Sequence, residues 1–282
     1  MVASSTAPTA SGDQTSGSNS VLRLLQLDWM NTFMYFTRLC TVISCICFIL
    51  APIIASLGAA GPAVWYQRAL IANAATSAFR LRQRIMQSGG QIRFSMESVR
   101  TLLAEDSLHY LIFSMLFVML PPVTVALVPV FCFALLHSAS FTESLLRASS
   151  GNVSTSHSSG PYGDSNHTSP LMRTLQSTIA KVRSNEQAIL RVVAMNEIML
   201  MGVAIFLAFS GSNALFLPFL YFQFLKLRYA SRRNPFCRQT FYELRILLQR
   251  FAINSSCPAF LSRFINSFID FLSRLSPPIA SS

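Results

Sequence analysis

The stretch MLPPVTVALVPV, residues 119–130, decides how this chain is expected to sit in a membrane. It lies inside a run, Ser107 to Thr142, that contains no Asp, Glu, Lys or Arg. One crossing of a bilayer needs about 20 apolar residues, and this run is considerably longer. Its prolines, Pro121, Pro122 and Pro129, interrupt helical hydrogen bonding. The run therefore predicts either one tilted, kinked helix or two short arms that form a hairpin and return to the same side.

Two further apolar runs are also free of charged residues. One contains LCTVISCICFILAPIIASLGAAG, residues 39–61, and Pro52 is expected to kink it. The other covers Ile198 to Leu225 and has a central break, SGSNALFLP, at residues 210–218. The runs 107–142 and 198–225 are thus both interrupted, and two such segments inserted mainly into one leaflet would act as wedges and bend a membrane. We expect membrane spans near residues 37–57, 108–136 and 198–225.

Composition indicates that lipid is the solvent of this chain. Of its 282 residues, 52% are hydrophobic and only 12% are charged, and the mean hydropathy is +0.46. Soluble domains carry about 25% charged residues. The net charge of +11 favours contact with anionic headgroups on the cytoplasmic leaflet. Nucleic acid is not expected as a partner, because the arginines do not form the aromatic-interleaved surface that such binding needs.

Lys and Arg are unevenly distributed around the runs. Two precede the first span, six lie in Arg68–Arg100, five in Arg147–Arg191 and nine from Lys226 onward. A model with three spans would place the six basic residues of Arg68–Arg100 and the nine from Lys226 onward together in the cytosol. Hairpins that keep every loop cytosolic explain the five basic residues of Arg147–Arg191 better. If the Ser-rich loop is lumenal, Asn152 and Asn166 are glycosylation acceptors.

The expected division is a disordered leader 1–20, a membrane domain 21–232 with a Ser-rich loop at 148–170, and basic amphipathic helices in 233–282.

Two segments between the runs are predicted to be helical. WYQRALIANAATSAFRLRQRI, residues 65–85, has arginines within a small-residue pattern, so we expect an interfacial or cytoplasm-side helix. Trp65 and Tyr66 at its start are typical of interface anchors. Residues 171–191 predict a short amphipathic helix.

The C-terminal region predicts two basic amphipathic helices separated from the last span by Asn234-Pro235. Aliphatic and aromatic residues fall on one face of each helix, with arginines elsewhere, as in helices that lie in the interface. Packing of these stripes on the transmembrane bundle is the alternative. The second stripe is Leu261, Phe264, Ile265, Phe268, Leu272 and Leu275. The residues expected at the membrane surface are Lys226, Arg228, Arg232, Arg233, Arg238, Phe241, Leu244, Arg245, Leu248, Arg250 and Phe251.

Few side chains are candidates for catalysis or for metal binding. Glu105 and His109 share a helical face, but a metal site needs further ligands, so we interpret them as a charged, capped entry to the second span. Glu197 begins an apolar run, and we expect interfacial anchoring rather than an intramembrane function. The six cysteines show no metal or disulfide spacing. The sequence predicts no catalytic residues, cofactor or metal.

Three stretches together resemble a known family. WYQRALIANAATSAFRLRQRI, LLAEDSLHYLIFSMLFV and RYASRRNPFCRQTFYELRILL, taken in order, are similar to the transmembrane protein 33 family. That family includes the insect Krüppel homologue two and the fungal pore-membrane proteins of the Pom/Per type. The likeness runs from about Leu25 to Pro277. It implies a non-enzymatic multi-pass protein of the endoplasmic reticulum and nuclear envelope, with reticulon-like or nuclear pore membrane proteins as partners.

The sequence therefore predicts an all-α, multi-pass helical membrane protein with broken, hairpin-like spans and amphipathic C-terminal helices. The first functional hypothesis is a scaffold that organises or shapes tubules of the endoplasmic reticulum, with the bilayer and anionic lipids as partners. A regulator or component of an ion channel or transporter is the alternative, and an enzyme acting on lipid is a third. Association into oligomers is compatible with each.

Overall fold

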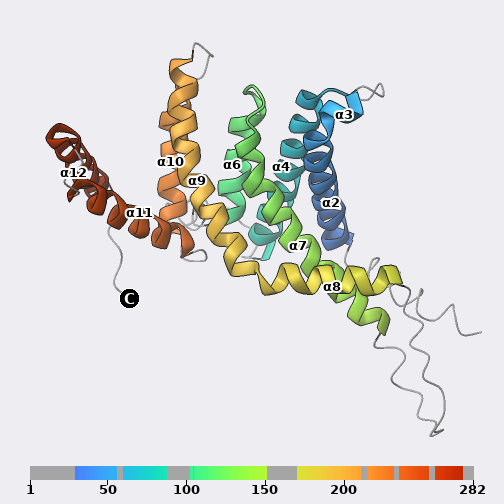
Figure 1. Ribbon diagram of the computed structural model, residues 1–282. Helices are drawn as coiled ribbons and strands as arrows, with labels where there is room; N and C mark the ends of the chain where they lie inside the picture. Colours follow the sequence, from blue (N-terminus) through green and yellow to red (C-terminus); the bar gives the residue numbers. More distant parts are fainter. Residues whose placement is uncertain are drawn as a thin grey trace, which may run out of the picture.

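The computed structural model describes residues 29–55, 60–87, 102–103, 105–150, 170–210, 215–231, 235–253 and 258–275, and its regular secondary structure in these residues is α-helical (Figure 1). Within these residues, α2, Thr124–Arg147 of α7, and α9 are long and apolar enough to cross a membrane. The predicted class, an all-α multi-pass membrane protein, is confirmed. The helices are α2 (Trp29–Ile49), α3 (Ala51–Ala55), α4 (Pro62–Gln87), α6 (Asp106–Val118), α7 (Thr124–Ser150), α8 (Pro170–Ser184), α9 (Glu186–Phe209), α10 (Leu217–Ala230), α11 (Phe236–Ile253) and α12 (Ala259–Leu275).

Six of the described helices form three hairpins whose turns lie at one end of a bundle (Figure 1). The pairs are α2–α4, α6–α7 and α9–α10. In the first pair, Phe33 meets Phe79 near the open end, and Phe48 lies 5.9 Å from Tyr66 near the turn. We call the end with the turns the tip and the opposite end the base. Both ends of every hairpin therefore reach the base.

Two of the predicted spans are each divided between two helices. Residues 108–136 contain most of α6, a turn at 119–123 and the start of α7, and residues 198–225 contain parts of α9 and α10. The proline pair at Pro121 and Pro122 lies in the first turn, where its missing N–H groups break no helical bond. Of the two arrangements predicted for residues 107–142, the structure has the hairpin.

Pro129 was expected to interrupt its run, but it lies inside α7 and the helix continues through it. A proline removes the N–H that would bond to the carbonyl four residues earlier, here that of Val125. Asn196 of α9 donates its side-chain N–H to this carbonyl oxygen at 3.0 Å. A neighbouring helix thus replaces the lost bond, which is how membrane helices tolerate proline.

This replacement predicts a coupling between two residues on different helices. Asn196→Ala should destabilise the protein by about 1–3 kcal/mol, because the Val125 carbonyl would be left without a partner in an apolar setting. In a Pro129→Ala background the restored backbone N–H bonds the carbonyl, so the same change should cost much less. Unfolding by dodecyl sulfate in mixed micelles, applied to all four proteins, measures this cycle. Equal costs of Asn196→Ala in the two backgrounds would contradict the pairing.

The segment at residues 65–85, expected to be an interfacial or cytoplasm-side helix, is helical as predicted, but it is part of α4 and packs along α2 and α6 within the bundle. Its small residues let the helix backbones approach closely, as in membrane helix pairs. Asn73 donates to Ser114 of α6 at 2.8 Å, and Thr76 donates to Thr37 of α2 at 2.8 Å. Tyr66, expected to be an interface anchor, is fully buried. The arginines of α4 misled the prediction because three of the four, Arg80, Arg82 and Arg84, lie in its last turns, away from the small-residue segment that packs on its neighbours.

The core is richest in aromatic residues between α6 and α10. Phe113, Phe117, Tyr221 and Phe224 are all buried, with ring centroids 4.7–6.4 Å apart. Such pairs add about 0.5–1.5 kcal/mol each beyond the area they bury. This contact holds the second hairpin to the third, and it lies between the tip and the charged base described below.

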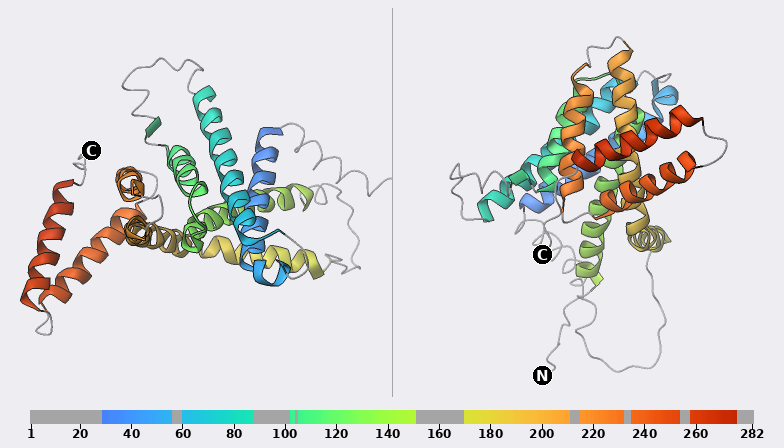
Figure 2. Two further views of the ribbon diagram at one scale, coloured as in Figure 1. Left: turned by 90° about the horizontal axis from the view of Figure 1, so that it is seen from above. Right: turned by 90° about the vertical axis from the view of Figure 1, so that its left-hand side faces the viewer.

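Three described helices lie outside the bundle, α8 and α11 near its base and α12 beside its middle (Figures 1 and 2). The helix expected at 171–191 is α8, which ends at Ser184, and α9 starts two residues later. Helix α11 packs on α9, and α12 packs on α11. The last two helices share a small core in which Ile265 and Ile269 meet Ala252.

Candidate functional site

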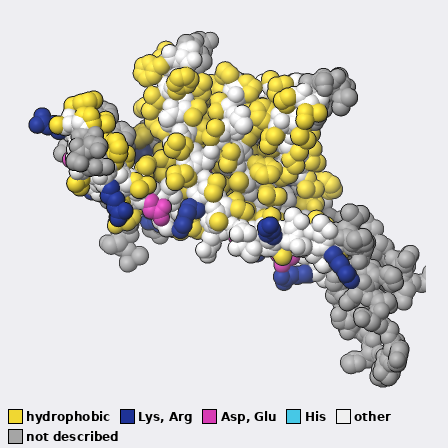
Figure 3. All heavy atoms as spheres, in the orientation of Figure 1, with side chains coloured by type: hydrophobic (Ala, Val, Ile, Leu, Met, Phe, Trp, Pro, Cys, Tyr) yellow, Lys and Arg dark blue, Asp and Glu magenta, His cyan; other side chains and the backbone are white. Residues whose placement is uncertain are grey.

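The outer surface of the bundle is apolar from the tip down to the base. Figure 3 shows hydrophobic side chains covering this face, with the Lys and Arg side chains gathered along its lower edge. The tip is the most exposed part: Met119 is 85% exposed, Phe209 86% and Phe216 78%. The described residues at this end of the second and third hairpins thus include large, exposed apolar side chains, which favour contact with hydrocarbon over water. The surface is suited to hydrocarbon, including at the turns.

Charged residues mark the level at which the bundle leaves the hydrocarbon. Arg38 lies in the first half of α2, and Arg80, Arg82 and Arg84 lie in the last turns of α4, so all four are near the base. Arg68 is the exception among the described bundle residues, because it lies two turns from the start of α4. Its guanidinium is 4.8 Å from the Trp65 ring centroid, an arrangement typical of the far membrane interface.

The second and third hairpins have arms of unequal length. α6 has 13 residues and α10 has 14, whereas α7 has 27 and α9 has 24. At the ordinary helical rise the short arms measure about 20 Å. That is less than the hydrocarbon thickness of about 30 Å. A short arm with an apolar turn either stops inside the bilayer or thins it, and both outcomes deform the membrane.

The apolar stripe predicted on α11 has two roles in the structure. Phe241 packs on Tyr229 of α10 at 5.6 Å between ring centroids, and Leu248 packs on the core shared with α12. Leu244 is half-buried, and Phe251 is 52% exposed. Much of the stripe therefore packs on protein. Large apolar residues elsewhere on the two helices are exposed, namely Tyr242, Leu247, Ile253 and Phe260.

The predicted basic residues of this region differ in their placement. Arg245 and Arg250 are exposed, whereas Arg238 and Lys226 are half-buried. Lys226 lies 5.9 Å from the Phe222 ring centroid. Cys237 on α11 is fully buried, and burial raises the pKa of its thiol to about 12. Four predicted positions, Arg232, Arg233, Asn152 and Asn166, lie outside the described residues, as do the side chains of Phe264, Phe268, Leu272 and Leu275.

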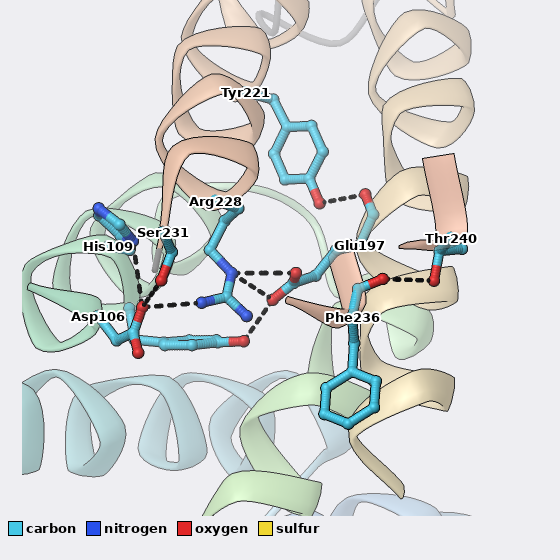
Figure 4. Close-up of polar contacts among 9 residues, drawn as sticks. Asp106, His109, Glu197, Tyr221, Arg228, Ser231, Phe236 and Thr240 are labelled. Carbon is cyan, nitrogen blue, oxygen red and sulfur yellow. Dashed lines mark hydrogen bonds and ion pairs between the residues drawn. The ribbon is translucent and has the colours of Figure 1, made fainter. Parts of the chain in front are cut away.

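A charged network is buried between α6, α9 and α10 (Figure 4). Arg228 and Glu197 are both fully buried, and the Nε of Arg228 lies 3.0 Å from a carboxylate oxygen of Glu197. The Nη1 of Arg228 also donates to Asp106 at 3.2 Å. One guanidinium thus bridges carboxylates on two helices. The membrane-surface role predicted for Arg228 and the interfacial role predicted for Glu197 are both wrong, because each neutralises the other inside the bundle.

Hydroxyl groups complete this network. Tyr110 of α6 donates to the Glu197 carboxylate, and Tyr221 of α10 donates to the Glu197 backbone carbonyl at 2.7 Å. Ser231, just after α10, donates to Asp106 at 2.9 Å. The Tyr110 ring also lies 5.1 Å from the guanidinium carbon of Arg228, a cation–π distance. The network therefore ties the start of α6 to the middle of α9 and the end of α10.

The acidic entry to α6 is part of this arrangement. His109 is fully buried, its Nε2 lies 2.7 Å from the Leu103 carbonyl, and its Nδ1 lies 3.7 Å from Asp106. Glu105 precedes α6 without a side-chain capping bond. Of the residues predicted to form a charged entry to the second span, His109 thus lies beside Asp106. Among the described residues, no group of three or more His, Cys, Asp or Glu side chains is arranged to hold a metal ion.

The ion pair of Glu197 and Arg228 could have been predicted from the sequence by one rule. An ionisable residue within an apolar helix normally has a partner of opposite charge in another helix. Glu197 and Arg228 both border the third apolar run, at opposite ends of it. Folding that run into a hairpin at its break brings its two ends together, so the pairing follows once the hairpin is accepted.

Comparison with known proteins gives a match over residues 13–278 to the family described as Transmembrane protein 33/Nucleoporin POM33. The chain is 40% identical to Transmembrane protein 33 of Rattus norvegicus, over 96% of this chain and 98% of the relative. It is 35% identical to the Transmembrane protein 33 homolog of Caenorhabditis elegans, over 93% and 87%. It is 32% identical to Krueppel homolog 2 of Drosophila melanogaster, over 92% and 83%. No solved structure matches the chain.

Proposed function

This chain belongs to the Transmembrane protein 33/Nucleoporin POM33 family, and from that premise we propose that it is a non-enzymatic scaffold that shapes membranes of the endoplasmic reticulum and nuclear envelope. The observation that carries the proposal is the set of hairpins with apolar turns and short arms. The nucleoporin in the family description supports a place in the nuclear envelope, which is continuous with the endoplasmic reticulum. Reticulon-like or nuclear pore membrane proteins are the partners that this role implies.

In the proposed topology, all three described hairpins enter the membrane from the cytosolic side. The arginines of the base then meet the cytosolic headgroups, as the positive-inside rule requires. α7 ends and α8 begins on the base side, so the Ser-rich linker between them stays in the cytosol. Asn152 and Asn166 are not glycosylated in this arrangement. More apolar volume enters the cytosolic leaflet than the lumenal one, and the membrane curves toward the cytosol.

Helices α11 and α12 add to this asymmetry. They project sideways from the bundle (Figure 2), with α11 starting at the base, where the headgroups of the cytosolic leaflet lie, and α12 above it beside the middle of the bundle. Their exposed apolar residues, such as Leu247 and Phe260, lie among the exposed arginines Arg245 and Arg250. Such a surface binds the interface by burying apolar area and by attraction to anionic lipids. The pair supports curvature by occupying area in one leaflet only.

Reconstitution tests the proposal directly. Full-length protein added to large vesicles containing anionic lipid should convert them to narrow tubules or small vesicles, seen by electron cryo-microscopy. The triple variant Arg238→Glu, Arg245→Glu and Arg250→Glu should bend them less, because about 1 kcal/mol of attraction per arginine is lost and then reversed. In vesicles without anionic lipid, the variant and the native protein should differ little. Vesicles that keep their diameter at high protein density would refute the shaping role.

No described contact favours the transport alternative. Glu197, the residue that a transport pathway through the third run would need, is bonded to Arg228 and lines neither of two cavities near the base, of about 450 Å³ and 310 Å³. Its carboxylate is therefore used in holding helices together.

A further inference from the structure

The larger of the two cavities near the base lies among α2, α4, α6, α7, α8 and α9. Its volume of about 450 Å³ is in the range of about 300–1,000 Å³ that is usual for ligand sites. Such sites are mostly lined by apolar side chains, with a few polar groups that orient the ligand. Here the proportions are reversed, because the only wholly apolar residues among the described ones that line the cavity are Phe133, Ala134, Leu136 and Leu190. The cavity is therefore suited to a strongly polar group.

Three serine hydroxyls from three helices line this cavity, namely those of Ser77 on α4, Ser107 on α6 and Ser140 on α7. No described residue is hydrogen-bonded to any of these hydroxyls. Ser77 is only 7% exposed, so its hydroxyl has little access to bulk water. Other hydroxyls of the bundle bond the carbonyl four residues earlier, as Thr41 does at 2.9 Å and Thr142 at 2.8 Å. The three serines therefore keep both donor and acceptor capacity for a molecule in the cavity.

One arginine of the lining is left for an anionic ligand. The other charged residues that line the cavity are bonded within the protein, in the pairs Asp106–Arg228, Glu186–Arg183 and Arg80–His137. Arg38 forms neither a hydrogen bond nor an ion pair with a described residue, and its side chain is half-buried. A partly buried charge is stabilised by an opposite charge close to it. The cavity therefore favours a ligand with a single negative charge beside Arg38.

A polyol joined to a phosphodiester meets both requirements. The hydroxyls of a polyol donate and accept hydrogen bonds, as the serine hydroxyls do, so each can satisfy the other. A phosphodiester carries one negative charge, and its two free oxygens match the paired N–H donors of a guanidinium. A phosphate monoester would bring more charge than Arg38 alone can balance. An apolar ligand would leave the serine hydroxyls buried without partners, which is costly.

We propose that this cavity binds the headgroup of a polyol phosphodiester lipid, the class to which phosphatidylinositol belongs. The base meets the cytosolic headgroups in the proposed topology, and the apolar outer surface above it can hold the acyl chains (Figure 3). The choice of a lipid over a soluble ligand rests on that topology. The site is separate from the hairpin turns and from α11 and α12. Its binding is measured in detergent, so failure of the site and failure of membrane shaping are distinguishable.

The test uses purified full-length protein in detergent, with short-chain phosphatidylinositol as the probe. Short-chain phosphatidylserine is the reference, because it has the same net charge and no polyol. Binding is followed by native mass spectrometry and by the rise in unfolding temperature. We expect phosphatidylinositol to bind at least about tenfold more tightly than phosphatidylserine. Equal binding of the two lipids would overturn the proposal and leave water as the occupant of the cavity.

Two variants separate the hydroxyls from the charge. Ser77→Ala combined with Ser140→Ala should weaken phosphatidylinositol binding by about tenfold and leave phosphatidylserine binding unchanged, because two hydrogen bonds to the polyol are lost. Arg38→Gln should weaken both lipids by similar factors, because both lose the same ion pair. A ratio of the two affinities that stays native in the serine double variant would overturn the role of the hydroxyls.

Ser144→Ala is the matched control. Ser144 lies one turn after Ser140 on α7, but it is exposed, donates to the Ser140 carbonyl at 3.1 Å and does not line the cavity. Its lipid binding should equal that of the native protein. The lipid-free serine double variant should unfold at the native temperature, and a lowered temperature would show that the hydroxyls are bonded within the protein, against the proposal. Displacement by glycerophosphoinositol at the same concentration as the short-chain lipid would overturn the lipid source and assign a water-soluble polyol phosphodiester.

Discussion

Arg228→Met should be the most damaging single change in this chain, with a loss of about 3–5 kcal/mol in the free energy of unfolding. The substitution leaves the carboxylate of Glu197 buried without its counter-ion, and the carboxylate of Asp106 loses its guanidinium donor. The cost comes from the groups that are left unpaired rather than from the strength of the pair itself. Unfolding by dodecyl sulfate in mixed micelles measures it, and Arg245→Met, at an exposed arginine on α11, is the matched control.

The same reasoning predicts a rescue. Glu197→Gln combined with Arg228→Met removes both charges of the fully buried pair, so the double variant should recover more than half of the loss. A single variant as stable as the native protein would show that the guanidinium is hydrated and not buried. A double variant no better than the single one would show that Asp106, rather than Glu197, is the partner that matters.

The second large effect concerns the turns of the hairpins. Phe216→Lys places a charge on the exposed apolar turn of the third hairpin. If the turn stays inside the hydrocarbon, the lysine should disfavour insertion by about 2.5–3.5 kcal/mol. Cell-free translation into microsomes, followed by carbonate extraction, reports the fraction that remains membrane-integrated.

Met119→Lys tests the second hairpin in the same way, because Met119 is equally apolar and exposed. Leu247→Lys on α11 is the control, since a lysine beside the headgroups can reach water. If the turns projected into the lumen, both turn variants would insert as well as this control. That result would contradict the proposal that the hairpin turns end inside the bilayer, while leaving the helical fold intact.

Much of the fold follows from the sequence alone, because composition and charge-free runs identify the segments that lie in lipid. The run 107–142 contains too many residues for one crossing and has a proline pair at its centre, so a hairpin was one of its two predicted forms. The role of α4 did not follow, since its arginines obscured the small-residue stripe that packs on α2. Pro129 shows a similar limit: whether proline breaks a helix depends on a donor, here Asn196, that only the tertiary structure supplies.

The candidate site was harder to predict than the fold. Glu197 and Arg228 were each interpreted alone, as residues near the ends of a span, and each alone is compatible with the interface. Their pairing depends on the α9–α10 turn bringing residues 31 positions apart in the chain into contact.

The proposed topology is tested most directly by measuring on which side of the membrane the linker between α7 and α8 and the C-terminus lie. A protease cleavage site placed after Gly160, and a second one after the last residue, should both be cut in sealed microsomes by protease added outside. Asn152 and Asn166 should carry no glycan in the same membranes. A linker cut only after detergent is added, or glycan at either asparagine, would contradict hairpins that enter from one face and the asymmetric wedge built on them.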